Sequence, residues 1–247
     1  DGRYMMDLDG LETLCAERRP RAMIVCNPHN PIGIQWPAEV LAEVAAICQR
    51  HGMLLISDEI YGDMVLDGAH YPTVTVSDAA RQVCVTIGAP SKTFNIPGIS
   101  SAWTVVHNPA LRDGFFQWLL ASEFDTPPLF AVTATEAAYS GGDDWLGCVL
   151  RYIRDNAAEV CGRLGALEGV RPFMPEAGFG LWVDFGGLGL DHDGLVRLLV
   201  DKARVAVSDG VTFGPGGEGF VRINIGVSRG VLMEGIDAIV NAVKSLK

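Results

Sequence analysis

Short runs of consecutive apolar residues are the feature that most restricts how this chain can fold. They span residues 22–26, 53–57 and 83–87, with a fourth candidate at 100–106. Unbroken apolar runs of this length are typical of strands that are buried on both faces of a parallel sheet. Between the first two runs, apolar residues recur at helical spacing from Pro37, which suits a helix start, to Gly52, which suits a left-handed cap. Strand and helix alternate, so this half is predicted to be a parallel α/β sheet with flanking helices.

The second half of the chain has a different pattern. From Asn108 onward the chain is predicted to be helical, and residues 145–164 place apolar side chains on one stripe of a long helix suited to bridging two domains. The chain beyond Gly169 is predicted to form a smaller α+β unit. Its expected elements are strands at 180–184, 205–208 and 220–225, a helix at 193–203 and a last helix capped by Ser228. We therefore predict a partial large domain over residues 1–150 and a small C-terminal domain over residues 151–247.

Composition narrows the possible partners and the cellular compartment. The 247 residues are 49% hydrophobic and carry a net charge of -11, which argues against nucleic acid or an anionic membrane surface as a partner. No apolar run approaches the roughly 20 residues that cross a bilayer, and the first ten residues do not resemble a signal peptide. The six cysteines form no C-x-x-C pair, and the five histidines show no metal-ligand spacing. These features predict a cytoplasmic protein with reduced cysteines and no metal site.

Polar side chains follow three of the predicted strands. Asn30 follows the first strand, and Asp58 and Tyr61 follow the second. Lys92 comes just after the third strand, within the stretch GAPSKTFNIPG at residues 88–98. The carboxyl ends of parallel strands border the crevice in which open α/β sheets bind ligands. An amine, a carboxylate, a phenol and an amide at this edge are what pyridoxal 5′-phosphate (PLP) requires, because the amine forms an imine and the carboxylate keeps the pyridine nitrogen protonated.

Each candidate residue also has an ordinary structural interpretation. Lys92 could be a surface lysine in a loop, Asp58 a helix N-cap and Tyr61 a packing residue. Arg222 could form a surface ion pair, although its place in the strand-like segment FVRIN favours a ligand-binding role. From the residues alone, both interpretations stay open.

The motifs, taken together, match those of a known family. CNPHNPIG, SDEIYGD and SKTFNIPG occur in order and at the right spacing, and FVRIN completes the set. The whole chain resembles the fold-type I PLP enzymes of the aminotransferase class I/II superfamily. NPHNPIG followed by Trp36, and the stretches at 145–156 and 207–224, are similar to the MalY/PatB group of cystathionine β-lyases. The resemblance implies a mostly parallel sheet with flanking helices, a smaller α+β C-terminal domain, PLP as cofactor and a homodimer.

The resemblance also implies roles for individual residues around the cofactor. Lys92 is implied to be the Schiff-base lysine and the proton shuttle at the substrate Cα. Asp58 is implied to pair with the pyridine nitrogen. Asn30 and Tyr61 are implied to share the phenolic oxygen, with Tyr61 also catalytic, and Ser91 is implied to contact the cofactor. Each of these residues lies in one of the matching motifs.

Further roles follow from the same resemblance. Arg222 is implied to hold the substrate α-carboxylate, which a planar guanidinium can bind through two parallel hydrogen bonds. Asn27, His29 and Glu59 are implied to shape the turns around these groups. All four lie in the matching motifs CNPHNPIG, SDEIYGD and FVRIN.

Three positions depart from the family pattern. Tyr61 stands where the lyase group commonly has histidine, and tyrosine is common there in transaminases. Ser100 stands where transaminases usually carry an arginine for the cofactor phosphate, which favours the lyase group. Ala89 replaces a serine with which many members touch that phosphate.

The implied function is PLP-dependent C–S β-elimination. The substrate would be cystathionine or another cysteine S-conjugate, cleaved to pyruvate, ammonia and a thiol. An aminotransferase acting on an L-amino acid would use every residue named above, so it stays open as an alternative. A non-catalytic module of a larger protein is a third possibility, although the intact set of Lys92, Asp58, Asn30 and Arg222 argues against it.

The resemblance further implies that the chain is a fragment. Full-length members of this family carry well over a hundred residues before the position of Asp1, including the helix N-terminus that binds the phosphate and the aromatic residue that stacks on the pyridine ring. We therefore expect the 247-residue chain to be inactive alone. We also expect an exposed apolar sheet edge to favour association.

Overall fold

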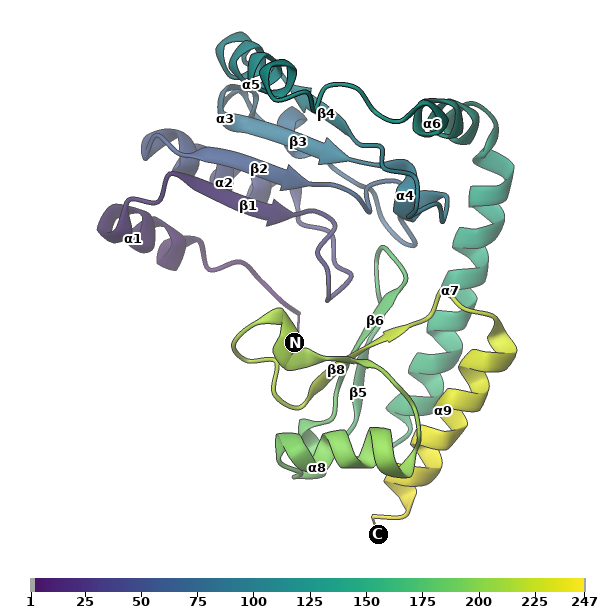
Figure 1. Cartoon of the computed structure of the whole chain (residues 1–247). Helices are drawn as coiled ribbons and strands as arrows, with labels where there is room; N and C mark the ends of the chain where they lie inside the picture. The colour runs from purple at the N-terminus through teal and green to yellow at the C-terminus, as the bar shows by residue number, and fades with distance from the viewer. Residues whose placement is uncertain (1–2, 247) are drawn as a thin grey trace. The chain divides into compact units, whose positions relative to one another are not determined.

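The structure of the chain is a computed structural model that describes residues 3–246, and it divides into two compact units (Figure 1). Unit 1 comprises the residues up to His29, Gln35–Val65 and Ala69–Leu146. Unit 2 comprises Asn30–Ile34, Leu66–Gly68 and the chain from Gly147 onward. Two short segments from the first half of the chain thus belong to the unit that the second half builds.

Unit 1 contains a four-stranded sheet in the order β1-β2-β3-β4. β1 pairs with β2 and β2 with β3 in parallel, whereas β4 runs antiparallel to β3. The sheet is therefore mostly parallel, as expected, with one antiparallel strand at its edge. The connection from β3 to β4 contains only a four-residue helix, so it does not carry the chain back along the sheet as a parallel crossover requires. The strands are β1 Ala22–Cys26, β2 Leu54–Asp58, β3 Cys84–Gly88 and β4 Trp103–Val106.

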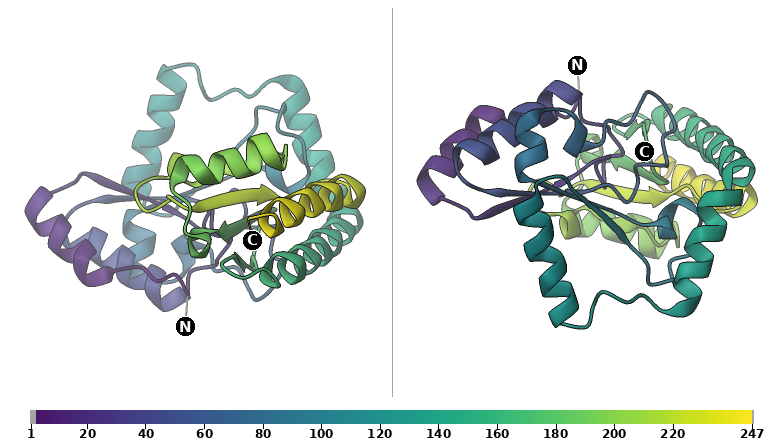
Figure 2. Two further views of the ribbon diagram at one scale, coloured as in Figure 1. Left: turned by 90° about the horizontal axis from the view of Figure 1, so that it is seen from below. Right: turned by 90° about the horizontal axis from the view of Figure 1, so that it is seen from above.

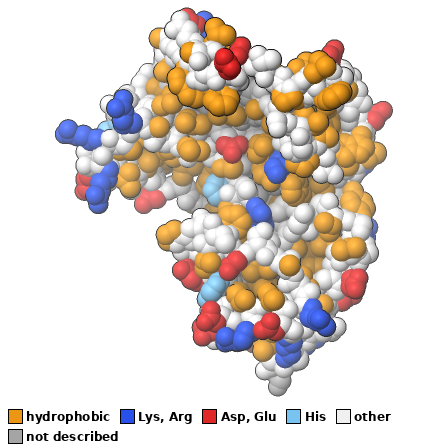
Figure 3. All heavy atoms as spheres, in the orientation of Figure 1, with side chains coloured by type: hydrophobic (Ala, Val, Ile, Leu, Met, Phe, Trp, Pro, Cys, Tyr) orange, Lys and Arg blue, Asp and Glu red, His pale blue; other side chains and the backbone are white. Residues whose placement is uncertain are grey.

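The core of unit 1 lies on one face of this sheet. Val25, Leu55 and Cys84 are buried on that face, where α2 lies behind the strands in Figure 1. The neighbouring side chain of Ile24 points to the other face, because successive residues of a strand alternate, and it is 70% exposed. Figure 3 shows hydrophobic side chains gathered over this second face. The helices of unit 1 are α1 Leu8–Arg18, α2 Ala38–Arg50, α3 Asp78–Val83, α4 Pro90–Thr93, α5 Pro109–Ala121 and α6 Leu129–Gly141.

Unit 2 is built on an antiparallel sheet in the order β5-β6-β8-β7. The long helix α7 begins in unit 1 and continues through unit 2, where α9 runs beside it (Figures 1 and 2). The expected helix at 193–203 begins as α8 but continues as a π-helical segment at Arg197–Lys202. The elements are α7 Asp143–Gly165, β5 Arg171–Phe173, β6 Gly180–Asp184, α8 His192–Val196, β7 Ser208–Asp209, β8 Phe220–Asn224 and α9 Arg229–Lys244.

A buried amide connects α7 to the end of β8. Asn156 is fully buried on α7, and its Nδ2 donates hydrogen bonds to the carbonyl oxygens of Ile225, at 2.9 Å, and Val227, at 3.3 Å. Its Oδ1 accepts a hydrogen bond from Arg229 Nε at 2.9 Å. A buried amide with three such partners holds the chain in one position, which fixes the segment between β8 and α9.

None of the helices that the structure describes between residues 3 and 246 combines the length and the apolar character needed to cross a membrane.

Candidate active site

The carboxyl edge of the unit 1 sheet presents an aspartate at the end of its central parallel strand. Asp58 is the last residue of β2, and it pairs with Cys26 of β1 and Ile87 of β3. Its Oδ1 accepts a hydrogen bond from the backbone N–H of Ile60 at 3.1 Å. Within residues 3–246 the other oxygen, Oδ2, has no hydrogen-bond partner. Asp58 therefore keeps one carboxylate oxygen available for a ligand.

The lysine singled out by the sequence lies at the same edge. β3 ends at Gly88, and α4 begins two residues later, so Lys92 follows the strand next to that of Asp58. Figure 1 shows α4 at the tip of β3. Lys92 is half-buried, and among the described residues its amine has no ion pair or hydrogen bond. A half-buried amine that no carboxylate holds is available for covalent chemistry.

Two further predicted residues lie in the same unit. Tyr61 is half-buried in the loop that follows β2, three residues after Asp58. Ser91 is the half-buried residue before Lys92 in α4. The structure thus gathers Asp58, Tyr61, Ser91 and Lys92 at one edge of the unit 1 sheet.

The other two predicted residues are brought together in unit 2. Arg222 Nη1 donates a hydrogen bond to Asn30 Oδ1 at 2.7 Å, although 192 residues separate them along the chain. Arg222 Nη2 donates to Ser208 Oγ at 3.2 Å, and the guanidinium lies 4.8 Å from the ring centroid of Phe213. Because the arginine occupies the amide oxygen, the Nδ2 of Asn30 is left to donate elsewhere. This pair therefore offers one amide donor and a guanidinium that three neighbours hold in place.

A glycine on the neighbouring strand allows this arginine to lie flat on the sheet. Gly180 of β6 is next to β8, and a Cβ there would come within 2.8 Å of Arg222 Cδ. The glycine therefore provides space for the arginine stem. The three contacts of the guanidinium and the need for a glycine at position 180 could not be inferred from the FVRIN motif alone.

Sequence reasoning assigned Glu59 only to turn shaping, but the structure shows it at the centre of a buried polar network. Glu59 is 4% exposed. Its Oε1 accepts hydrogen bonds from Ser57 Oγ at 2.9 Å and from the Thr73 backbone N–H at 2.8 Å. Its Oε2 lies 2.9 Å from His70 Nε2. The carboxylate next to Asp58 thus ties the end of β2 to residues 70–73.

The turn after β1 is held by packing and by hydrogen bonds. The His29 ring meets Trp36 edge-on with centroids 5.5 Å apart, and Trp36 Nε1 donates to the Cys26 carbonyl at 3.0 Å. Burial lowers the pKa of the His29 imidazole, which favours the neutral ring. Asn27 is fully buried, with its Nδ2 donating to the Tyr71 carbonyl at 2.9 Å. Within the described part of the chain, no group of three His, Cys, Asp or Glu side chains could hold a metal ion.

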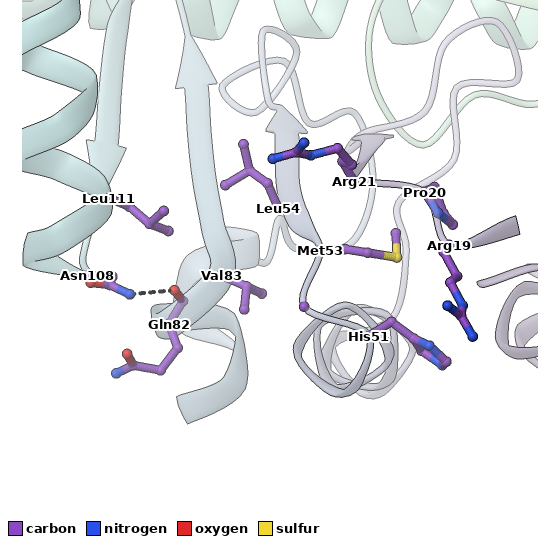
Figure 4. Close-up of a pocket in the computed structure, with 11 residues that line it drawn as sticks. Arg19, Pro20, Arg21, His51, Met53, Leu54, Gln82, Val83, Asn108 and Leu111 are labelled. Atoms are coloured by element: carbon purple, nitrogen blue, oxygen red, sulfur yellow. Dashed lines mark hydrogen bonds between the residues drawn. The ribbon is translucent and has the colours of Figure 1, made fainter. Parts of the chain in front are cut away.

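A separate cavity lies at the opposite, amino edge of the unit 1 sheet (Figure 4). Its volume is about 460 Å³, and it reaches Leu54, the first residue of β2, whereas Asp58 is the last residue of that strand. Asn108 Nδ2 donates to the Gln82 carbonyl at 2.9 Å at one side of this cavity. The cavity is therefore distinct from the edge that carries Asp58 and Lys92. Its lining residues are Arg19, Pro20, Arg21, His51, Gly52, Met53, Leu54, Gln82, Val83, Asn108 and Leu111.

Comparison with known proteins gives a consistent result. The family model described as aminotransferase class I and II matches residues 2–239. The chain is 38% identical to the cystathionine β-lyase PatB of Bacillus subtilis over 238 residues, which are 96% of this chain and 62% of that protein. It is 32% identical to protein MalY of Escherichia coli, covering 99% of this chain and 63% of that protein. The chain thus spans less than two thirds of the length of these relatives.

Comparison with a solved structure supports the same family for the fold of this chain. The structure of cystalysin from Treponema denticola, which contains a PLP cofactor, matches 100% of this chain and 63% of its own with a TM-score of 0.94 at 29% identity. The expected fold-type I architecture with a mostly parallel sheet is therefore confirmed, and so is the resemblance to the cystathionine β-lyase group.

Proposed function

The chain belongs to the aminotransferase class I and II family, and on this basis we propose that it forms part of a PLP-dependent carbon–sulfur β-lyase. The substrate is cystathionine or another cysteine S-conjugate, and the products are pyruvate, ammonia and a thiol. The observation that carries this proposal is the free carboxylate oxygen of Asp58 and the unpaired amine of Lys92 on neighbouring strand ends, in a chain 38% identical to a cystathionine β-lyase.

The residues present fit PLP as the cofactor. Lys92 would hold it covalently through its amine, and the free oxygen of Asp58 would accept a hydrogen bond from the protonated pyridine nitrogen. Asn30 and Tyr61 would donate to the phenolic oxygen, with the amide of Asn30 oriented by Arg222. Ser91 would contact the cofactor next to Lys92. When bound, PLP supplies an electron sink for the carbanion that forms at the substrate Cα.

Each protein side chain then has a defined task in the elimination. Arg222 binds the substrate α-carboxylate through the part of its guanidinium that Asn30 and Ser208 leave free. Lys92 accepts the proton from Cα, which is general base catalysis by a positioned amine. The Cβ–S bond then breaks, and its electron pair leaves with the thiolate. Tyr61 assists these proton movements, and water converts the remaining three-carbon enamine to pyruvate and ammonia.

We further propose the domain to which each unit belongs, the cellular location of the protein and its oligomeric state. Residues 1–150 form part of a large cofactor-binding domain and residues 151–247 form the small domain, a division supported by the change from unit 1 to unit 2 between Leu146 and Gly147. A cytoplasmic location is supported by the six cysteines, none of which forms a disulfide in the described chain. A homodimer is supported by exposed apolar side chains of unit 1.

An aminotransferase is the second candidate, and Tyr61 is the observation in its favour, since the lyase group commonly has histidine at this position. The two activities differ in what they consume. We expect cystathionine to release thiol and pyruvate without any 2-oxo acid acceptor. Turnover that depends strictly on an added 2-oxo acid would instead identify a transaminase. Because the chain spans 62% of the length of its relative PatB, both this chain and the longest form of the protein that contains it should be assayed.

The apolar surface of α5 and α6 leads to a prediction about assembly. Five large side chains are between 59% and 79% exposed, and Figure 3 shows hydrophobic side chains over both helices. Contiguous exposed apolar patches are uncommon on monomeric proteins and often mark a surface that contacts another protein. These residues are Trp118, Leu120, Phe124, Leu129 and Phe130.

Replacing Leu129 and Phe130 together with aspartate should therefore weaken self-association. We expect the dissociation constant measured by sedimentation to rise at least about tenfold, the change that corresponds to roughly 1.4 kcal/mol. Val231→Asp is the matched control, because Val231 is a single exposed apolar residue, 64% exposed, on α9. An unchanged dissociation constant for the double variant would show that this surface is not the interface.

A further inference from the structure

A hydrogen-bonded cluster next to Lys92 is not explained by the roles assigned so far. Asp63 Oδ2 accepts hydrogen bonds from Thr93 Oγ1 and from the Tyr139 hydroxyl, both at 3.3 Å. Trp103 Nε1 donates to the same Tyr139 hydroxyl at 3.0 Å. We call Asp63, Thr93, Trp103 and Tyr139 the Asp63 cluster. It joins four separate elements of unit 1: the loop after β2, α4, β4 and α6.

The helix that carries Lys92 is too short to hold its own position. α4 has four residues, and a helix of one turn has little stability without tertiary contacts. Thr93, the residue after Lys92, is 1% exposed and donates its hydroxyl proton to Asp63. The link between α4 and the loop after β2 is therefore a buried hydroxyl next to the lysine.

The residue that follows α4 is held by the same neighbour. The Phe94 ring meets Tyr139 edge-on with centroids 5.4 Å apart and stacks on Trp145 with centroids 6.3 Å apart. A Cβ on Gly142 would lie 2.4 Å from Phe94 Cε1, so the ring lies against the corner between α6 and α7. Tyr139 thus supports α4 twice, through its ring at Phe94 and through its hydroxyl at Asp63.

The start of α4 meets the remaining member of the cluster. Trp103 of β4 pairs with Gly88, and a Cβ at Gly88 would lie 2.2 Å from Trp103 Cζ2. The indole therefore occupies the space beside the end of β3, from which α4 leaves. Burial raises the pKa of Tyr139, and the charge of Asp63 adds to this effect. The Tyr139 hydroxyl consequently remains a proton donor to Asp63 at neutral pH.

We propose that Asp63 is a positioning residue for Lys92, which rests on the proposed function of Lys92 as the cofactor lysine. It acts through its hydrogen bonds to Thr93 and Tyr139, which hold the two residues that follow the lysine, Thr93 and Phe94. Asp63 comes two residues after Tyr61, so the loop that carries Tyr61 also fixes the direction of the lysine. The carboxylate itself need not touch the substrate or the cofactor.

The test compares two substitutions that each remove one hydroxyl. Thr93→Val removes the hydrogen bond to Asp63. The control, Thr135→Val, removes a hydrogen bond of 2.9 Å between Thr135 of α6 and Ser101, and this bond does not involve α4. The first readout is the rate at which a limiting amount of acetic anhydride acylates Lys92 relative to the exposed Lys202, measured on peptides by mass spectrometry. The second readout is amide hydrogen exchange across residues 88–98. Neither readout requires PLP.

We expect Thr93→Val to raise both the Lys92 to Lys202 acylation ratio and the exchange rate of α4 by about fivefold, the effect of losing one hydrogen bond. Tyr139→Phe, which keeps the ring on Phe94, should act in the same direction. Thr93→Ser should restore both values, and Thr135→Val should leave them unchanged. If Thr93→Val does not fold, Tyr139→Phe decides.

The proposal is wrong if folded Thr93→Val or Tyr139→Phe protein keeps the parental acylation ratio, or if Thr135→Val changes it equally. A spectrum with added PLP separates this outcome from a failure of the proposed function. A parent chain that forms no imine would mean that these 247 residues alone do not hold the cofactor, while the acylation ratio would still report whether Asp63 positions the lysine.

Discussion

Lys92→Ala should abolish the violet-region absorbance that PLP develops on binding to the chain. The band requires an imine between the cofactor aldehyde and a lysine amine. Lys92 is the half-buried lysine at the carboxyl edge of β3, and no carboxylate in the described chain holds its amine. We therefore expect complete loss of the saturable band in an absorption titration, and not a modest change in affinity.

A control variant and the identification of the lysine that carries PLP test this result. Lys202→Ala removes an exposed lysine of unit 2 and should leave the band intact. Reduction with borohydride, followed by peptide mass spectrometry, should find the cofactor on Lys92. A Lys92→Ala variant with the parental band would contradict the site. A parent chain without a band would mean that the phosphate and ring contacts needed by PLP lie outside these 247 residues.

The sequence predicts the position of those site residues that directly follow a strand along the chain. Asp58 and Lys92 each follow an apolar run, and parallel strands bring the ends of such runs to one edge. The structure confirms that both residues lie at that edge. Their placement needed no knowledge of distant contacts, because strand direction alone determines it.

Contacts between distant segments could not be predicted in this way. Asp63 and Tyr139 are 76 residues apart, and Asn30 and Arg222 are 192 residues apart, so no local pattern indicates that they meet. The antiparallel direction of β4 could not be predicted for a related reason. An apolar run predicts a strand but contains no information about its direction, which the short connection through α4 determines.

The second large effect is expected from Glu59→Ala. The Glu59 carboxylate is buried and receives hydrogen bonds from Ser57 Oγ and the Thr73 backbone N–H, and it pairs with His70. Removal of the carboxylate leaves the donors of Ser57 and Thr73 without an acceptor, and each unsatisfied buried donor costs about 1–3 kcal/mol of unfolding free energy. Urea denaturation followed by tryptophan fluorescence should show this loss. The melting temperature should fall by about 2–4 °C for each kcal/mol in a domain of this size.

A matched substitution shows whether the loss of stability in Glu59→Ala comes from the burial of the carboxylate or only from its charge. Glu43→Ala also removes a carboxylate from an ion pair, but Glu43 is 48% exposed beside Arg50, so we expect a change of at most about 1 kcal/mol. Glu59→Gln should lie between the two, since the amide retains one oxygen acceptor for Ser57 and Thr73. Equal effects of Glu59→Ala and Glu43→Ala would show that the network contributes nothing beyond a surface pair. A large difference would mean that Glu59 holds the loop that carries Tyr61 and Asp63 from its buried side.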